Sequence, residues 1–284
     1  MLTPTFGARN ERLTIHSSGQ TNRYAFGLPL SSGVGSVDQP HPHIDVEQEL
    51  AHVIRSLGGR VLEDEHGSTL PFKNSDYYFP ELGVAAELKR LVLDQESDPK
   101  AQKCIQSKFS QWMNDGTIGV NYGTHKINSG DLPARCQVEL LDCFSAPLRR
   151  RIHKANKQLK QTLGYFKPSS SKGLLFIVND GNMSLKPDIA RFLIARILGR
   201  DFATINSVVY FTANLVASSP LTEKDVFVWA HLNRKAVIEP VDSSFVMTVF
   251  EAWLKRVEVL RGQPIERITL GRLDLGNIEN RPQC

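Results

Sequence analysis

The sequence contains few cysteines, four in 284 residues. Cys104, Cys136, Cys143 and Cys284 form no Cys-x-x-Cys pair, and their density is far below that of disulfide-rich secreted domains. We therefore expect reduced thiols and a cytoplasmic location. Because Cys136 and Cys143 have no histidine at ligand spacing, packing in the core is the expected role rather than zinc binding.

Long apolar runs are also absent. No run approaches the roughly 20 residues that a bilayer-spanning helix needs. The N-terminal residues lack the basic segment and apolar run of a signal peptide. We therefore expect no membrane partner. The length suffices for one large domain or two small ones, and the composition of 41% hydrophobic and 23% charged residues is that of an ordinary globular protein.

The net charge of the chain is only +4, and it therefore does not by itself indicate a nucleic-acid-binding protein. The distribution of charge is more informative, because residues 149–172 contain eight Lys or Arg and no acid. Such a surface attracts phosphates. The alternative is a solvated helix face. The candidate nucleic-acid-binding residues are Arg149, Arg150, Arg151, Lys154, Lys157 and Lys160.

A glycine-rich loop between a strand and a helix is missing too. Gly33-Val34-Gly35 follows no predicted strand and precedes no phosphate-loop lysine, which argues against a Rossmann-like nucleotide-binding enzyme. Residues 1–44 show no helical or strand periodicity and are predicted to form an N-terminal arm, with a short strand near 24–26. His41 and His43 are expected to be loop residues rather than metal ligands.

The stretch 74–89 is the clearest motif. Two short apolar runs flank a turn at 80–83, which is the pattern of a β-hairpin. Asp76 opens the first strand, and Glu87 and Lys89 lie two residues apart near the end of the second, so they share one face. The apolar run before Glu87 indicates a strand buried on both sides, where a charged group needs a partner or a metal.

Two carboxylates on adjacent strands suit a magnesium ion, which prefers oxygen ligands and keeps several waters for a phosphate substrate. A nearby lysine can orient an attacking water and offset the charge of a phosphate. The alternative is a surface hairpin whose Glu87 and Lys89 form a solvated ion pair of little energetic worth.

The segments around the hairpin predict an α/β protein. Asp45 caps a helix that ends at Gly58-Gly59, and a short first strand is expected at 60–64. Asp98 and Pro99 start a helix over 100–113. A further set of elements follows, namely helical residues 136–166 with a basic helix over 147–163, strands at 173–178, 208–211 and 226–229, and helices over 189–198 and 244–261.

An acid on one strand followed by Glu-x-Lys on the next resembles the active site of the PD-(D/E)xK nuclease superfamily, which has the restriction-endonuclease-like fold. Asp76, Glu87 and Lys89 match the motif, and Ser75 stands where the superfamily often has proline. The helix after Asp45 looks like the first core helix of archaeal Holliday-junction resolvases. In that alignment Glu47 matches the helical glutamate that helps complete the metal site.

The resemblance implies that Asp76, Glu87 and the backbone carbonyl of Leu88 hold Mg²⁺, for which Mn²⁺ can substitute. Glu47 would assist directly or through water, and Lys89 would position the nucleophilic water. The implied fold is a mixed central sheet flanked by helices, with a helical insertion and N- and C-terminal extensions. The implied activity is metal-dependent hydrolysis of phosphodiester bonds by an endonuclease, with DNA favoured over RNA.

The predicted organisation is an N-terminal arm at 1–44, a first part of the nuclease core at 45–129, a basic helical insertion at 130–172, and the rest of the core at 173–284. A homodimer would explain double-strand cleavage. A role in restriction or defence, with a partner protein, would fit the superfamily. The leading alternative is a non-catalytic nucleic-acid-binding or scaffold protein on the same fold.

Overall fold

The computed structural model of the chain describes residues 23–27, 43–66, 73–92, 98–119, 131–183, 185–199, 202–218, 225–234, 239–268 and 279–282. Most of the predicted N-terminal arm therefore lies outside the described residues. Contacts divide the chain into two compact units. The first comprises residues 1–18 and 95–150, and the second comprises residues 19–94 and 151–284. The predicted domain limits stay predictions.

The first unit contains helix α3 (Pro99–Asn114) and the beginning of helix α4 (Ala134–Phe166). Asp98 caps α3 as predicted, with its carboxylate accepting a hydrogen bond from the Lys100 N–H at 3.0 Å. The two helices enclose a small apolar core. That core contains Ile105, Phe109, Trp112, Leu132, Cys136, Leu140, Cys143 and Phe144.

A disulfide joins Cys104 of α3 to Cys143 of α4, with their Cα atoms 5.8 Å apart. The expectation of reduced thiols is therefore wrong for this pair. The two residues are 39 positions apart in sequence, and only the packing of α3 on α4 brings them together. Cys136 is a buried free cysteine beside them and packs in the core, as predicted.

The described residues of the second unit form a mixed sheet of ten strands. The order along the sheet is β10-β7-β8-β6-β5-β4-β3-β2, and β1 pairs with β8 and β9. Their bounds are β1 Arg23–Gly27, β2 Arg60–Val61, β3 Tyr77–Phe79, β4 Val84–Leu91, β5 Lys172–Asn179, β6 Ile205–Thr212, β7 Leu215–Ser218, β8 Asp225–Asn233, β9 Glu266–Ile268 and β10 Glu279–Pro282.

The centre of this sheet is parallel. Strand β5 lies between β4 and β6 and pairs in parallel with both, whereas β3 and β8 join antiparallel on either side. The residues of β5 after Lys172 are all buried, as expected for a strand covered on both faces. The predicted α/β class with a mixed sheet flanked by helices is confirmed.

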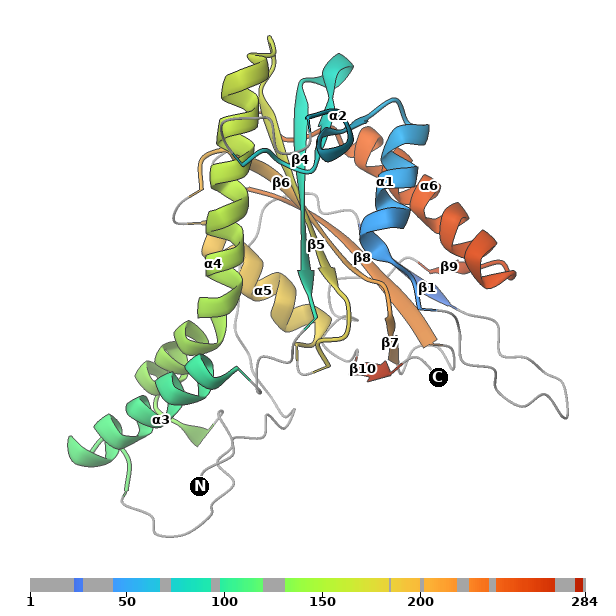
Figure 1. Cartoon of the computed structure of the whole chain (residues 1–284). Helices are drawn as coiled ribbons and strands as arrows, with labels where there is room; N and C mark the ends of the chain where they lie inside the picture. Colours follow the sequence, from blue (N-terminus) through green and yellow to red (C-terminus); the bar gives the residue numbers. More distant parts are fainter. Residues whose placement is uncertain are drawn as a thin grey trace, which may run out of the picture. The chain divides into compact units, whose positions relative to one another are not determined.

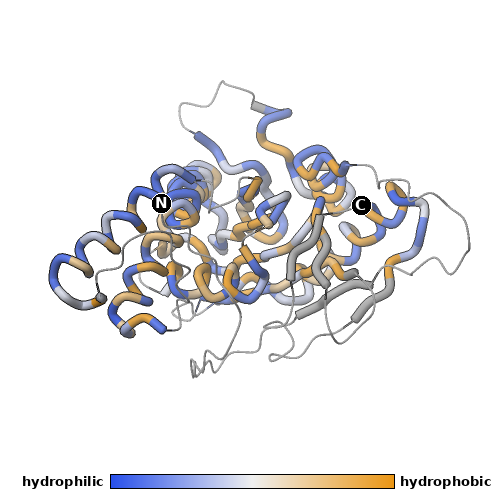
Figure 2. The backbone as a smooth tube through the Cα atoms, turned by 90° about the horizontal axis from the view of Figure 1, so that it is seen from below, coloured by the Kyte–Doolittle hydropathy of each residue, from blue (hydrophilic) through white to orange (hydrophobic). Residues whose placement is uncertain are grey.

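Helices α1 (Val46–Ser56) and α6 (Ser243–Arg261) cover one face of the sheet, and α5 (Pro187–Leu198) and α4 lie toward the other (Figure 1). A large apolar core fills the space beneath α1 and α6. In Figure 2 the helical segments alternate between hydrophilic and hydrophobic residues along the tube, as amphipathic helices do. The strand residues Val84, Ala86 and Leu88 face this core.

Helix α1 forms as its sequence predicts. The Asp45 carboxylate accepts a hydrogen bond from the Gln48 N–H at 3.2 Å and so satisfies one of the amides left open at the helix start. Val46, Leu50 and Ile54 are completely buried and form the apolar stripe.

Helix α4 confirms the helical residues predicted at 136–166, but not the separate basic helix predicted over 147–163. It is one helix of 33 residues with Pro147 inside it, not a helix that begins at Pro147. An internal proline costs a helix about 3 kcal/mol. The buried positions Leu140, Phe144, Leu148 and Ile152 recur every four residues on both sides of the proline. Burial of these apolar residues on both sides of the proline offsets this cost.

The strand expected at 60–64 is also shorter than predicted. It ends at Val61, and a short helix α2 (Leu62–His66) follows. Asp64 pairs with Arg55, and Glu65 pairs with Arg60, so the acidic residues turn back toward neighbouring cations instead of continuing the strand. Within the ranges given above, no helix is long and apolar enough to cross a membrane.

Candidate functional site

The hairpin predicted at 74–89 is present as β3, a short 3₁₀ turn at Pro80–Leu82, and β4. Gly83 ends the turn with φ of +61°, a left-handed conformation that favours glycine. A Cβ atom there would lie 1.8 Å from the Ser170 carbonyl oxygen, so a side chain does not fit. This tight turn fixes the register in which Tyr77 pairs with Ala86.

That register places Asp76 beside Glu87. Tyr77 is opposite Ala86 in this antiparallel pair, so Asp76, which precedes Tyr77, is opposite Glu87, which follows Ala86. Because side chains alternate along a strand, Asp76 and Glu87 lie on the face of the sheet opposite to that of Tyr77 and Ala86. The Asp76 carboxylate accepts a hydrogen bond from the Leu88 N–H at 2.7 Å. Burial raises the pKa of Asp76, and the Leu88 N–H and the charge of Lys89 oppose this rise.

Glu87 is the least exposed ionisable group of the hairpin, with 0% of its surface accessible. One of its oxygens, Oε1, accepts a hydrogen bond from Lys89. The other, Oε2, is buried without a hydrogen-bond partner among the described residues. Burial, followed by the charge of Asp76, raises the pKa of Glu87 to about 8. The negative charge of a carboxylate in this position is therefore not fully balanced by the positive charge of Lys89.

Lys89 lies on the same face as Glu87, as strand alternation predicts. Its ammonium group contacts Glu87 and also donates a hydrogen bond to the side-chain oxygen of Gln158 at 3.2 Å. The side chain is 15% exposed, so part of it is reachable by water. Asp76, Glu87 and Lys89 are therefore brought together on one face.

Glu47 is not part of this group. It pairs at 3.4 Å with Arg90, which is next to Lys89 in β4 and points to the opposite face. Arg90 is held in turn by Asp180, with a shortest distance of 2.6 Å. The charge of Glu47 contributes to the raised pKa of Asp76. Its influence on the site is thus electrostatic, and the predicted direct role stays a prediction.

Glu49, two residues after Glu47 in α1, is buried and forms an ion pair with Arg256 of α6 at 2.5 Å. This pair ties α1 to α6. Glu49 therefore has a structural partner away from the hairpin.

The donor set at the hairpin is compatible with a hard divalent cation. Asp76 and Glu87 offer two carboxylates, and Glu87 Oε2 is a buried oxygen that lacks a partner. In a strand the N–H and C=O of one residue point to the same neighbour, so the Leu88 carbonyl is directed to the side on which its N–H meets Asp76. Mg²⁺ is commonly bound by one or two carboxylates with waters and substrate phosphates.

The same donor set is small. In the part of the chain that the structure describes, no three His, Cys, Asp or Glu side chains gather where they could hold one metal ion. Glu87 Oε1 and Asp76 Oδ2 also have hydrogen-bond donors already. The protein by itself thus supplies a two-carboxylate site, whose remaining ligands would be waters and substrate.

The basic residues predicted to bind nucleic acid lie along α4. Arg149 and Arg150 belong to the first unit, and Arg150 pairs with Asp98 at 3.5 Å. In the second unit Lys154, Lys157 and Lys160 are exposed, and no described acid forms an ion pair with them. Arg151 is half-buried. Successive spacings of three residues put the three lysines along one side of the helix.

Sequence reasoning missed two residues that hold the hairpin. Gln158 and Thr162, one turn apart on α4, are both buried and contact the segment that leads to Asp76. The Thr162 hydroxyl accepts a hydrogen bond from the Ser75 N–H at 2.8 Å, and Gln158 donates to the Asn74 carbonyl at 2.9 Å. Their position on the apolar side of a basic helix is the signal that could have found them.

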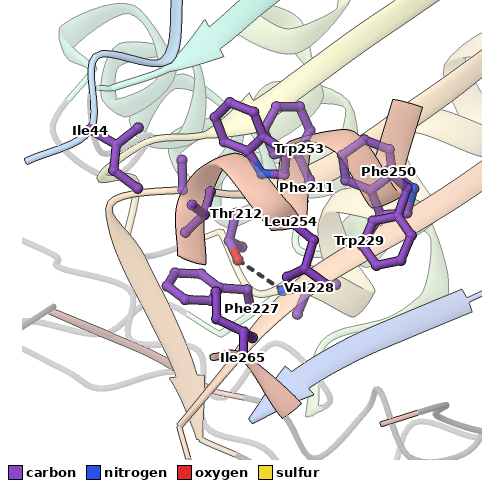
Figure 3. A pocket seen from close by; sticks show the side chains of 12 residues that line it. Ile44, Phe211, Thr212, Phe227, Val228, Trp229, Phe250, Trp253, Leu254 and Ile265 are labelled. Carbon is purple, nitrogen blue, oxygen red and sulfur yellow. Dashed lines mark hydrogen bonds between the residues drawn. The ribbon is translucent and has the colours of Figure 1, made fainter. Parts of the chain in front are cut away.

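An apolar pocket lies elsewhere in the second unit, between α6 and the sheet (Figure 3). Its lining is almost wholly hydrophobic, with Phe211, Trp229 and Trp253 among the largest groups. The hydroxyl of Thr212 is turned to the backbone and accepts a hydrogen bond from the Val228 N–H at 2.9 Å. The pocket therefore lacks the ionisable groups that hydrolytic chemistry needs, and the hairpin remains the candidate site.

No family model matches this sequence, and no curated protein or solved structure matches it either. The hairpin is therefore the feature of this protein from which its function is inferred.

Proposed function

We propose that this protein is a metal-dependent nuclease of the PD-(D/E)xK type, with the restriction-endonuclease-like fold, that hydrolyses phosphodiester bonds in DNA. The observation that carries the proposal is Glu87. Its carboxylate is completely buried beside a second carboxylate, Asp76, and its Oε2 lacks a hydrogen-bond partner among the described residues. Placing such a group in a sheet is costly unless a cation joins it.

Asp76, Glu87 and the Leu88 carbonyl are the groups that would hold Mg²⁺, with Mn²⁺ able to substitute. When bound, such an ion polarises the phosphoryl oxygen and lowers the pKa of water. Glu47 belongs to the proposal only as a nearby negative charge, since Arg90 is its partner. The two-carboxylate set leaves room for phosphate oxygens as further ligands.

Lys89 has the clearest chemical role among the protein groups. Its ammonium group, held by Glu87 and Gln158, can donate a hydrogen bond to the attacking water or to a phosphate oxygen. In the hydrolysis the water oxygen bonds to phosphorus while the bond to the leaving oxygen breaks. One proton leaves the water for solvent, and the leaving oxygen takes one from solvent. Lys89 offsets negative charge that builds up on the phosphate.

The exposed lysines of α4 support a polyanionic substrate. Lys154, Lys157 and Lys160 form no ion pair with an acid among the described residues. They belong to the same helix that contacts the hairpin through Gln158. Neutralising phosphates releases counterions and supplies affinity that does not depend on sequence. DNA is the favoured substrate. A homodimer would account for double-strand cleavage, and restriction or defence alongside a partner protein is the biological setting that the family resemblance favours.

The second candidate is a non-catalytic nucleic-acid-binding protein on the same fold. It is favoured by the absence, among the described residues, of a third acidic ligand near Asp76 and Glu87. Such a protein would bind DNA or RNA in a salt-sensitive manner without requiring divalent metal.

The test is cleavage of plasmid DNA, linear DNA and RNA in Mg²⁺ or Mn²⁺ by the wild type and by Glu87→Ala and Lys89→Ala. The control is Glu81→Gln, because Glu81 is exposed in the turn of the same hairpin. We expect metal-dependent cutting that falls at least about 100-fold in both hairpin variants and is kept in the control. Cutting that survives both substitutions would place the chemistry elsewhere, and salt-sensitive binding without cutting would favour the second candidate.

A further inference from the structure

Helix α4 contacts the candidate site through its inner face. Gln158 and Thr162 are four residues apart, so they lie one above the other on the helix, and both are buried. Thr162 binds the Ser75 N–H, whereas Gln158 bridges two groups. Its Nε2 donates to the Asn74 carbonyl at 2.9 Å and its Oε1 accepts from the Lys89 ammonium group at 3.2 Å.

The bridge fixes which way the Gln158 amide is turned. The Asn74 carbonyl can only accept a hydrogen bond, and the ammonium group can only donate, so the amide nitrogen must face Asn74 and the amide oxygen must face Lys89. Gln158 is 9% exposed, and therefore little water competes for either contact. Its oxygen is a fixed acceptor for the lysine.

An ammonium group has three N–H donors. Among the described residues Lys89 uses one on Glu87 and one on Gln158. Since the three donors are tetrahedrally arranged, fixing two of them also fixes the direction of the third. With Glu87 as its one partner, the ammonium group would rotate about that contact, and the flexible four-carbon stem of lysine would not prevent this.

We propose that Gln158 is the positioning residue for Lys89, and that it aims the remaining N–H of the ammonium group at the phosphate or at the attacking water. The catalytic part of this inference rests on the proposed nuclease function. Gln158 does not touch the reacting atoms. It acts through Lys89, and its second contact anchors the amide to the backbone just before Asp76.

The kinetic test uses Gln158→Met, which keeps the length of the side chain and removes both hydrogen bonds. We expect kcat to fall about 10- to 100-fold with KM unchanged, because the loss is one of orientation and not of binding. In a Lys89→Ala background the same substitution should cause no further loss. An equal loss in that background would show that Gln158 acts on the structure at large, and would overturn the proposal.

Thr162→Val is the matched comparison, since it removes a hydrogen bond from the same helix face to the neighbouring residue of the same segment. Because Thr162 contacts Ser75 and not Lys89, any loss that this variant causes should persist in the Lys89→Ala background. The two double-mutant cycles therefore separate the positioning of Lys89 from the support of the segment before Asp76.

A second test needs neither metal nor substrate. The rate at which a lysine-specific acylating reagent modifies Lys89 is measured by mass spectrometry, with the exposed Lys154, Lys157 and Lys160 as internal standards. We expect Gln158→Met to raise the Lys89 rate about three- to tenfold, the factor that one lost hydrogen bond gives, and Thr162→Val to leave it unchanged.

The labelling test and the cleavage test contradict different parts of the proposal. Equal labelling of Lys89 in wild type and Gln158→Met would overturn the contact itself. A wild-type protein that cleaves no nucleic acid would overturn the proposed function, and with it the catalytic role of Gln158, while the labelling difference would still report the contact.

Discussion

At the scale of single residues, Glu87 is in conflict with its surroundings. An apolar residue at this position would satisfy the sheet, yet the chain buries a carboxylate beside Asp76 and leaves one of its oxygens without a described partner. Functional sites commonly contain such groups, because their chemistry requires arrangements that the fold alone would not favour. Lys89 offsets only part of the cost, as the raised pKa of Glu87 indicates.

This conflict predicts how stability depends on pH. The pKa of Glu87 is about 8 in the folded protein, above its ordinary value of 4.5, so the folded state holds the proton more tightly. The free energy of unfolding is then highest below pH 4.5 as far as this group is concerned, and falls as the pH rises through about 8. Without divalent metal, Glu87→Gln should remove this loss and exceed the wild type at alkaline pH by up to about 5 kcal/mol, the free energy that corresponds to this rise in pKa.

The measurement is urea unfolding of metal-free protein at a series of pH values between about 5 and 9. Glu81→Gln, a change to an exposed residue of the same hairpin, should keep the slope of the wild type. If the free energy of unfolding depends on pH in the same way in Glu87→Gln and in the wild type, the pKa of Glu87 is not raised in the folded protein.

At the scale of elements, the helices and the hairpin that were predicted correctly are those whose formation depends on contacts between residues close in sequence. Helix α1 and helix α3 are confirmed because their start signals, Asp45 and Asp98, act on amides two or three residues away. The hairpin is confirmed because its turn at Gly83 is equally local. Local chemistry was therefore enough for the elements that hold Asp76, Glu87 and Lys89.

Three features that the sequence did not predict depend on contacts between residues that are far apart in the chain or on packing between helices. Pro147 looks like a helix start, and only a buried stripe that continues on both sides keeps α4 whole. Cys104 and Cys143 meet because two helices pack together. Gln158 reaches Lys89 from 69 residues away, which no spacing in the sequence encodes.

Helix α4 also yields a prediction about binding. Changing Lys154, Lys157 and Lys160 together to glutamine should weaken binding to duplex DNA about equally for every sequence. The slope of log affinity against log salt concentration should fall by about 2.7, near 0.9 for each lost phosphate contact. Filter binding or fluorescence anisotropy across a salt series measures this slope.

Lys255→Gln, which removes one exposed lysine of α6, is the comparison variant and should leave the slope unchanged. A triple variant that binds with the wild-type slope would show that this side of α4 does not meet the phosphates.

At the scale of the whole molecule, the hairpin and helix α4 of the second unit bring several buried polar groups together beside β4, namely Ser75, Glu87, Gln158 and Thr162. The parallel strands β4, β5 and β6 provide a rigid base. The hairpin supplies Asp76, Glu87 and Lys89, and α4 supplies the two side chains that hold them. The sequence predicted the first group because a single hairpin contains it, and could not predict the second because only the folded chain brings α4 there.

The proposed binding of a divalent cation by Asp76 and Glu87 is tested by Mn²⁺ binding followed by electron paramagnetic resonance. Free Mn²⁺ is titrated with the wild type, Asp76→Asn, Glu87→Gln and the control Glu81→Gln. We expect one site in each wild-type chain, kept in the control and weakened at least about tenfold in each of the two other variants. Equal binding by all four proteins, or none by the wild type, would show that Asp76 and Glu87 do not hold a divalent cation.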